Sequence, residues 1–202
     1  MKIFAIVKNC LLTAALAAGV SVATTAFAHT FIYEGFLSGA NESPVQITPG
    51  TGHVLVTLDL DLNEMRIQAS FSDLRGTVTQ AHIHCCTTIP FTATVGVATT
   101  LPFFEGFPVG VTAGVYDKTL DLTLASSWNP SFVTASGGIG GALNRLEHGL
   151  AEGRAYFNIH TSVVGGGEIR SFLVPVPEPE TYALLLAGLG LMALTAVRRK
   201  RG

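Results

Sequence analysis

Charge is scarce in this chain, because only 13% of its 202 residues are Asp, Glu, Lys or Arg. Six of the twelve basic residues stand near the two ends, and residues 29–175 hold six basic and twelve acidic side chains, a net charge of −6. An acidic segment without a Lys/Arg patch repels phosphate backbones. The composition therefore excludes nucleic acid as a partner of this segment.

Cysteine is scarce too, with three residues, Cys10, Cys85 and Cys86. Cys10 falls in a segment that we expect to be removed, and adjacent cysteines cannot join distant parts of a fold. A disulfide framework is therefore excluded, and apolar burial must stabilise the domain. For Cys85 and Cys86 three interpretations stay open: a disulfide between neighbours, two partly buried thiols, or soft metal ligands.

Motifs of the common enzyme classes are missing. The sequence has no Gly-x-Ser-x-Gly, no phosphate-binding loop and no spaced carboxylate pair in an obvious cleft context. It also has no internal repeat and no low-complexity tract. These absences favour a non-enzymatic protein.

The N-terminal segment, residues 1–28, has the three parts of a secretory signal. Lys2 and Lys8 supply positive charge, residues 11–22 are apolar, and Ala26-Phe27-Ala28 is a small-x-small cleavage site. We expect export by Sec-type machinery and cleavage after Ala28, which leaves His29 as the first mature residue. The alternative is an uncleaved anchor helix.

The C-terminal segment, residues 176–202, has three parts in order. Pro177-Glu178-Pro179 comes first, residues 182–197 follow without a charge, and Arg198-Arg199-Lys200-Arg201 ends the segment. At 1.5 Å per residue the apolar run predicts a transmembrane helix of about 24 Å. The basic cluster is typical of the cytoplasmic side of a membrane, and the prolines interrupt helix between domain and membrane.

This C-terminal segment resembles the PEP-CTERM sorting signal. The resemblance implies an exosortase-type enzyme as a partner and a transient stay in the inner membrane. The protein would then reach the cell surface or the extracellular matrix. An ordinary single-span anchor is the alternative.

The central segment, residues 29–175, alternates apolar and polar residues in several short runs, which is typical of half-buried β-strands. The strands that we expect span residues 30–37, 53–60, 65–71, 78–84, 120–124, 154–160 and 168–174. Residues 61–64 make the second and third of these a hairpin. Residues 90–114, rich in Gly, Pro and Phe, predict a long connection with at most one short strand.

One helix is expected over residues 139–150, where Ile139, Leu143, Leu146 and Leu150 form an apolar stripe, and Gly149 and Gly153 should end it. Short strands with Gly-rich turns indicate an antiparallel two-sheet sandwich. The predicted fold class is therefore mainly β, with one short helix and a C-terminal transmembrane helix.

Four short motifs in this segment carry a family resemblance. They are Gly39-Ala40-Asn41-Glu42-Ser43-Pro44, Ala81-His82-Ile83-His84, Tyr156-Phe157-Asn158-Ile159-His160-Thr161 and Gly167-Glu168-Ile169-Arg170. In this order, over about residues 30–173, they resemble the CHRD domain, first named from chordin. A Gly usually follows the second His of the middle motif, and Cys85-Cys86 stands there instead, so the following loop should differ. The CHRD family has no established enzymatic activity, so the resemblance says more about the fold than about the function.

Three histidines form the candidate site. His82 and His84 are two residues apart on one expected strand, so both rings point to the same face. If the strand of His160 lies nearby, three imidazoles converge, which suits copper or zinc with an open position for water. The alternative is that the rings only bond backbone or Glu168 and fix strand edges.

Glu168 and Arg170 share one face of the last expected strand. Glu168 is a candidate to accept a hydrogen bond from a ligand histidine and so fix its ring, and the alternative is an internal ion pair with Arg170. Two functions follow from the sequence. The first is a non-enzymatic surface module that binds matrix polysaccharide or another surface protein, or only adds bulk to the matrix. The second is a copper or zinc protein.

Overall fold

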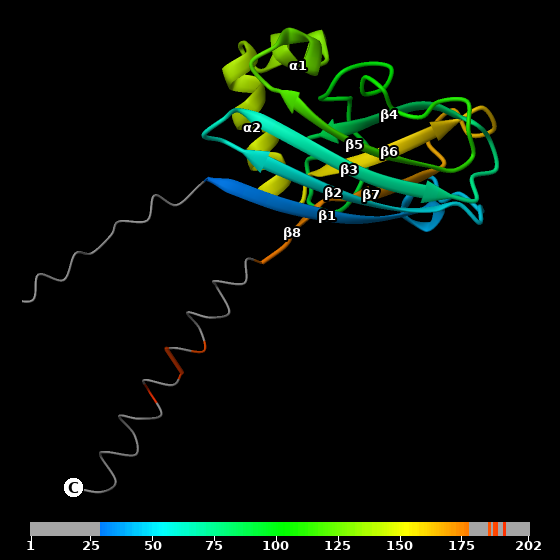
Figure 1. The fold of residues 1–202 in the computed structure, drawn as a ribbon, viewed down its shortest axis with the longest axis horizontal. Helices are drawn as coiled ribbons and strands as arrows, with labels where there is room; N and C mark the ends of the chain where they lie inside the picture. Colours follow the sequence, from blue (N-terminus) through cyan, green and yellow to red (C-terminus); the bar gives the residue numbers. More distant parts are fainter. Residues whose placement is uncertain (1–28, 178–185, 187, 190–191, 193–202) are drawn as a thin grey trace, which may run out of the picture.

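The computed structural model describes residues 29–177, together with residues 186, 188–189 and 192. Within these residues the chain forms eight strands and two α-helices (Figure 1). The strands are β1 (Thr30–Ser38), β2 (Thr51–Asp59), β3 (Glu64–Ser72), β4 (Val78–Cys85), β5 (Gly114–Asp121), β6 (Ala155–Thr161), β7 (Ile169–Phe172) and β8 (Val174–Pro175). The helices are α1 (Pro130–Ala135) and α2 (Ile139–Ala151).

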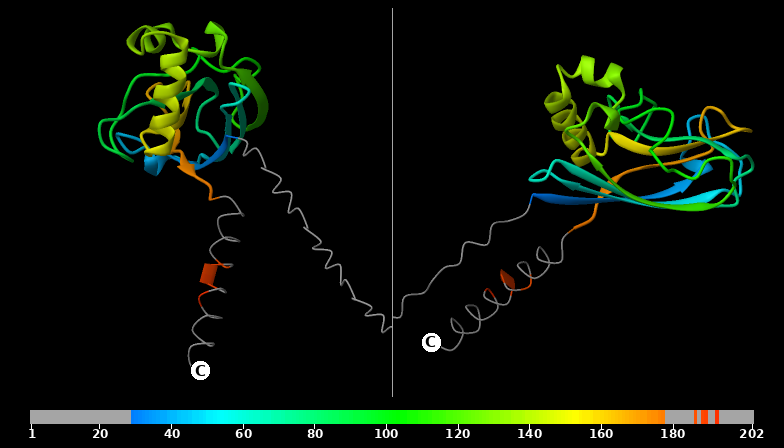
Figure 2. Two further views of the ribbon diagram at one scale, coloured as in Figure 1. Left: turned by 90° about the vertical axis from the view of Figure 1, so that its left-hand side faces the viewer. Right: turned by 45° about the horizontal axis from the view of Figure 1, so that its top comes forward.

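All eight strands belong to one antiparallel sheet in the order β4-β6-β7-β1-β2-β3-β5, and β8 pairs with β1. β1 and β7 are joined by a single register pair, Ser38 with Arg170. At this narrow junction the sheet curls, so that β4, β6 and β7 lie behind β1, β2, β3 and β5 in Figure 1, and β6 and β7 lie above β1 and β2 in the right-hand view of Figure 2. The prediction of a mainly β, antiparallel fold is confirmed. The prediction of two separate sheets is corrected, because β7 pairs with both β6 and β1.

The core lies inside this curl and follows the two-residue period of the strands. On β2 and β3 every second side chain is buried, as in Val54, Val56 and Leu58. Phe157 and Ile159 on β6 face them from the other half, and α2 adds Leu146 and Leu150 at one end of the sheet (Figure 1). Alternation along the sequence therefore becomes an inside and an outside of the curled sheet.

Two predicted elements differ from the structure. The strand expected at 120–124 begins at Gly114 and ends at Asp121, because the carboxylate of Asp121 accepts hydrogen bonds from the N–H and hydroxyl of Thr123 and turns the chain. Helix α1 was not expected, because its six residues are too short for an apolar stripe. Its capping signal was readable, since the Asn129 side chain accepts from the Ser131 N–H just before Pro130.

Several predicted features lie outside the described residues: the signal at 1–28 with Ala26 and Ala28, Glu178, Pro179, most of the helix at 182–197, and the basic cluster at 198–201. Pro177 is described and exposed. No helix in the described part of the chain is both long and apolar enough to cross a membrane. The transmembrane helix therefore stays a prediction.

Cys85 and Cys86 form a disulfide with each other at the end of β4. Their sulfurs lie 3.8 and 3.3 Å from the carbonyl oxygen of Arg145, and they pack against Gly149 of α2. Gly149 therefore lies inside α2, not at its end where the sequence predicted it. The disulfide explains why this residue is a glycine, because it leaves no room for a side chain there. The predicted helix at 139–150 is otherwise confirmed.

Replacing either of two glycines of α2 by alanine should change the stability of the fold, but in opposite directions. A Cβ at Gly149 would overlap the Sγ of Cys85 and lie 2.6 Å from the Sγ of Cys86, whereas a Cβ at Gly140 would meet nothing within 4 Å. We expect Gly149→Ala to destabilise the fold by about 1–3 kcal/mol through overpacking. Gly140→Ala should stabilise it by about 0.5–1 kcal/mol through helix propensity. Urea unfolding of both variants measures this, and equal effects would show that α2 does not press on the disulfide.

Candidate functional site

Three histidines lie together on the face of the sheet that points away from the hydrophobic core: His82 and His84 on β4, and His160 on β6. The register pairs His82 with Asn158 and His84 with Tyr156, and it places His160 opposite Gln80. The residues between them, such as Ile83 and Ile159, point into the core instead. The two-residue period of adjacent strands therefore brings all three histidines together, as the sequence predicted for neighbouring strands.

The three rings form a compact buried cluster. His82 lies 4.7 Å from His84 and 4.8 Å from His160 between ring centroids, and His84 and His160 are 6.1 Å apart. One ligand nitrogen from each ring lies within 4.8 Å of the other two. Only 1–9% of each residue is exposed. The cluster is therefore shielded from bulk water.

The hydrogen bonds of the rings decide where each proton sits. His84 Nδ1 lies 2.7 Å from the carbonyl oxygen of Val95, and His160 Nδ1 lies 2.9 Å from that of Gly165. Because a carbonyl only accepts, both Nδ1 atoms carry the proton and donate it. The side-chain amide of Gln80 lies 3.4 Å from His82 Nε2, and with the amide oxygen turned to the ring, as here, Nε2 is the donor.

The other nitrogen of each ring has no hydrogen-bond partner. These atoms are Nδ1 of His82, Nε2 of His84 and Nε2 of His160, and all three are buried. Since the proton of each ring sits on the opposite nitrogen, each of these atoms offers a lone pair. This is the arrangement of a metal-binding histidine, whose second nitrogen donates to a backbone or side-chain oxygen.

Electrostatics keep the rings neutral. Burial, with the charges that His84 and His160 would carry, lowers the pKa of His82 to about 3. Burial also lowers the pKa of His84 to about 4, against the opposing effect of its bond to Val95. The pKa of His160 is lowered for the same reason, in part offset by Gly165. At neutral pH no proton has to leave before a metal binds.

The donor set fits copper or zinc. Three neutral imidazoles without a carboxylate suit these ions better than magnesium or calcium, which prefer oxygen ligands. Cys85 and Cys86 are joined in a disulfide and offer no thiolate. The fit therefore rests on His82, His84 and His160 alone.

A second polar group, which the sequence did not single out as a site, lies beside the histidines. Arg170 lies over the ring of Tyr156 at 4.7 Å, and Tyr156 stacks on His84 at 4.5 Å. The guanidinium is also 3.7 Å from the Glu42 carboxylate, which accepts a hydrogen bond from Asn158 Nδ2 at 3.4 Å. Burial raises the pKa of Glu42 to about 7, although Arg170 and Asn158 oppose it. The available signal was the motif at 39–44, which contains Glu42.

Glu168 does not support a histidine in the way that the sequence predicted. Its carboxylate accepts hydrogen bonds from the hydroxyls of Thr48 and Thr161 and from the backbone N–H groups of Arg75 and Gly76. The alternative ion pair with Arg170 is also wrong, because Arg170 pairs with Glu42. Glu168 precedes β7, so the alternation that would put it beside Arg170 does not reach it.

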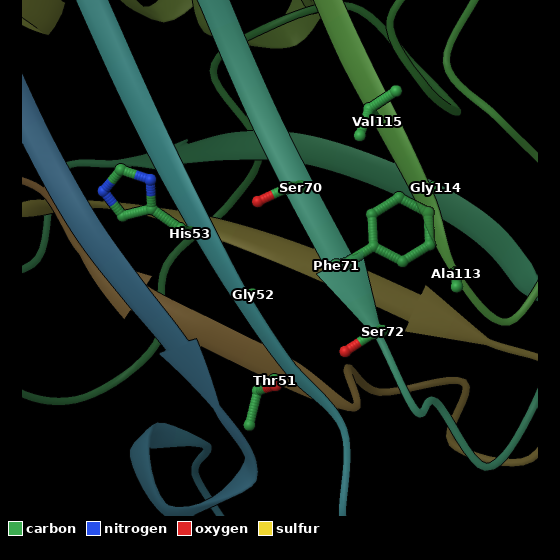
Figure 3. A pocket seen from close by; sticks show the side chains of 9 residues that line it. All are labelled: Thr51, Gly52, His53, Ser70, Phe71, Ser72, Ala113, Gly114 and Val115. Carbon is green, nitrogen blue, oxygen red and sulfur yellow. The ribbon is translucent and has the colours of Figure 1, made fainter.

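A separate surface hollow of about 630 Å³ lies across β2, β3 and β5 (Figure 3). His53, Ser70 and Val115 line its floor from three neighbouring strands, and the register pairs them in one row. His53 bonds Glu34 at 2.7 Å and takes no part in the cluster. The hollow is wide open and contains none of the three clustered histidines.

Two family models match this chain. The family model described as CHRD domain matches residues 33–173, which include every residue of the histidine site. The model described as PEP-CTERM protein-sorting motif matches residues 175–201. That motif implies processing by exosortase-type machinery, with export and a transient membrane stage before the cell surface. No curated protein and no solved structure matches the chain. By the family match over most of its length, the chain belongs to the CHRD domain family and carries a PEP-CTERM sorting motif.

Proposed function

We propose that this exported, sorted surface protein is a metal-binding protein that holds one copper or zinc ion between His82, His84 and His160. One observation carries the proposal. Each ring donates a proton from one nitrogen and leaves the other as a buried lone pair without a partner. A buried polar atom without a partner costs about 1–3 kcal/mol, and a bound ion removes that cost at three atoms at once.

Metal content is the direct test. The purified full-length protein should carry about one copper or zinc ion per chain, as measured by mass spectrometry. The His82→Ala/His160→Ala double variant should carry none, because a single remaining imidazole cannot hold the ion.

The matched control is His148→Ala, because His148 is an exposed histidine on α2 outside the cluster. It should keep the metal of the parent protein. A folded parent protein without metal, after exposure to both ions, would contradict the proposal. The surface-binding role predicted from the sequence, with matrix polysaccharide as a ligand, would then be the better hypothesis.

We also propose the processing that the sequence predicts at both ends. Sec-type export would remove residues 1–28, and an exosortase-type enzyme would act at Pro177-Glu178-Pro179 while residues 182–197 hold the chain in the inner membrane. The mass of the protein recovered from the cell surface tests this. It should begin at His29 and lack Arg198–Arg201. An intact chain in the membrane fraction would support an ordinary anchor.

A further inference from the structure

Five buried side-chain nitrogen or oxygen atoms in the described part of the chain have no hydrogen-bond partner. Three are the lone-pair nitrogens of His82, His84 and His160, and the other two are Oδ1 of Asn158 and Oε1 of Glu42. Buried polar atoms are normally paired. That all five gather in one region indicates a common cause, and three metal–nitrogen bonds account for only three of them.

The sheet register places Asn158 beside the histidine cluster. Asn158 is directly opposite His82, and along β6 it stands between Tyr156, which faces His84, and His160. Side chains of directly opposed residues lie about 5 Å apart on the same face of a sheet. The Asn158 side chain therefore lies at the edge of the cluster, next to His82.

Glu42 lies next to Asn158, because its Oε2 accepts a hydrogen bond from Asn158 Nδ2 at 3.4 Å. A Cβ added to Gly167 would lie 2.6 Å from Asn158 Oδ1 and 2.8 Å from Glu42 Oε1, so both oxygens border the same glycine. Two acceptors at one place require a hydrogen-bond donor between or beside them. Arg170 serves the other oxygen of Glu42, and its positive charge disfavours a second cation there.

A surface hollow lies next to this pair. It has a volume of about 530 Å³ and is lined by Asn41, Glu42, Arg170 and Phe172, among others. In the sheet, Asn158 stands between Arg170 of β7 and His82 of β4, so a single residue separates the lining of the hollow from the nearest proposed metal ligand.

We propose that Asn158 and Glu42 form the ligand-binding side of the metal centre and hold a small neutral hydrogen-bond donor, water in the resting protein, in the open coordination position of the ion. This inference rests on the proposed metal site. It makes the centre an open one that exchanges its fourth ligand through the Glu42–Arg170 hollow. A closed structural site would fill all four positions with protein ligands.

Water-proton relaxation of the full-length protein loaded with Cu²⁺ tests the inference. An exchangeable water on the ion speeds the relaxation of bulk water protons, so the parent protein should show an inner-sphere contribution. Asn158→Leu should lose it while keeping about one copper per chain, and Asn158→Asp, which retains an acceptor oxygen, should restore it. Glu42→Leu is a second variant, which removes both acceptor oxygens of the carboxyl group and should lower the inner-sphere contribution even if Asn158→Leu fails to fold.

Ser171→Ala is the control, because Ser171 lines the same hollow but bonds only the neighbouring Phe172 carbonyl. It should leave the relaxation unchanged. If copper binds in the parent protein without an inner-sphere contribution, or if Asn158→Leu and Glu42→Leu both leave it unchanged, the inference is overturned and the metal site stands. A proton shared between Glu42 and Asn158 would then satisfy the two oxygens. If no metal binds at all, the proposed function itself fails.

Discussion

Replacing Glu168 by alanine should destabilise the fold by about 3–5 kcal/mol, because four donors would lose a buried, charged acceptor. Glu168 is fully buried and ties three segments together: Thr48 before β2, the turn at Arg75 and Gly76, and Thr161 at the end of β6. The segments are far apart in sequence, so nothing local replaces the lost bonds. Urea unfolding at neutral pH measures the difference.

The effect of Glu168 should also depend on pH in a defined direction. Burial by itself raises the pKa of Glu168, but the bonds from Thr161, Thr48, Arg75 and Gly76 outweigh it and bring the pKa below its ordinary value. A carboxylate with a lowered folded pKa stabilises the fold above its unfolded pKa, near pH 4. That stability is lost as the pH falls through the folded pKa. The gap between parent and Glu168→Ala should therefore shrink in acid.

The control is Glu105→Ala, which removes a carboxylate whose side chain is 87% exposed and pairs with Lys118. Exposed ion pairs contribute about 0–1 kcal/mol, so this variant should unfold almost like the parent. Equal losses in the two variants would mean that the Glu168 network does not hold the three segments together.

Arg170→Met should cost about 2–4 kcal/mol, because two backbone carbonyl oxygens and the Glu42 carboxyl lose a buried, charged donor. The guanidinium donates to the carbonyl oxygens of Asn41 and Ala93, lies 3.7 Å from Glu42 and covers the ring of Tyr156. Methionine keeps the apolar length but leaves these acceptors without a donor. Because Arg170 opposes the rise in the pKa of Glu42, that pKa should rise further in the variant.

A double-mutant cycle with Glu42→Leu separates packing from charge. Removing both partners leaves no unpaired buried ion, so the Arg170→Met/Glu42→Leu variant should lose clearly less stability than the sum of the two single variants. The raised pKa of Glu42, about 7, gives a second readout. A raised folded pKa means that its contribution is present below the unfolded pKa and lost as the pH rises through 7, so this dependence should vanish with Glu42. Additive losses would argue against a coupled pair.

Much of the fold could be predicted from local patterns. The period of two located β1, β2, β3, β4, β6 and β7 within a few residues, and the apolar stripe located α2. The pattern failed where a side-chain hydrogen bond turns the chain. At Asp121 the carboxylate accepts from the Thr123 N–H, so β5 ends before the predicted Leu124. It also could not tell one curled sheet from two sheets, because the single Ser38–Arg170 pair that joins the halves leaves no mark on alternation.

For the candidate site, the sequence by itself determined which residues could share a face. On a strand, His82 and His84 must point to the same face, because successive side chains of an extended backbone alternate between the two faces of the sheet. Only the tertiary structure decided that β6 is the neighbour of β4, which way each ring nitrogen is bonded, and that Glu42 rather than Glu168 is the carboxyl beside them. The pairing of β4 with β6 joins His82 to Asn158, and the hydrogen bond between Glu42 and Asn158 spans 116 residues. Such contacts are set by the packing of the whole sheet, which no local spacing records.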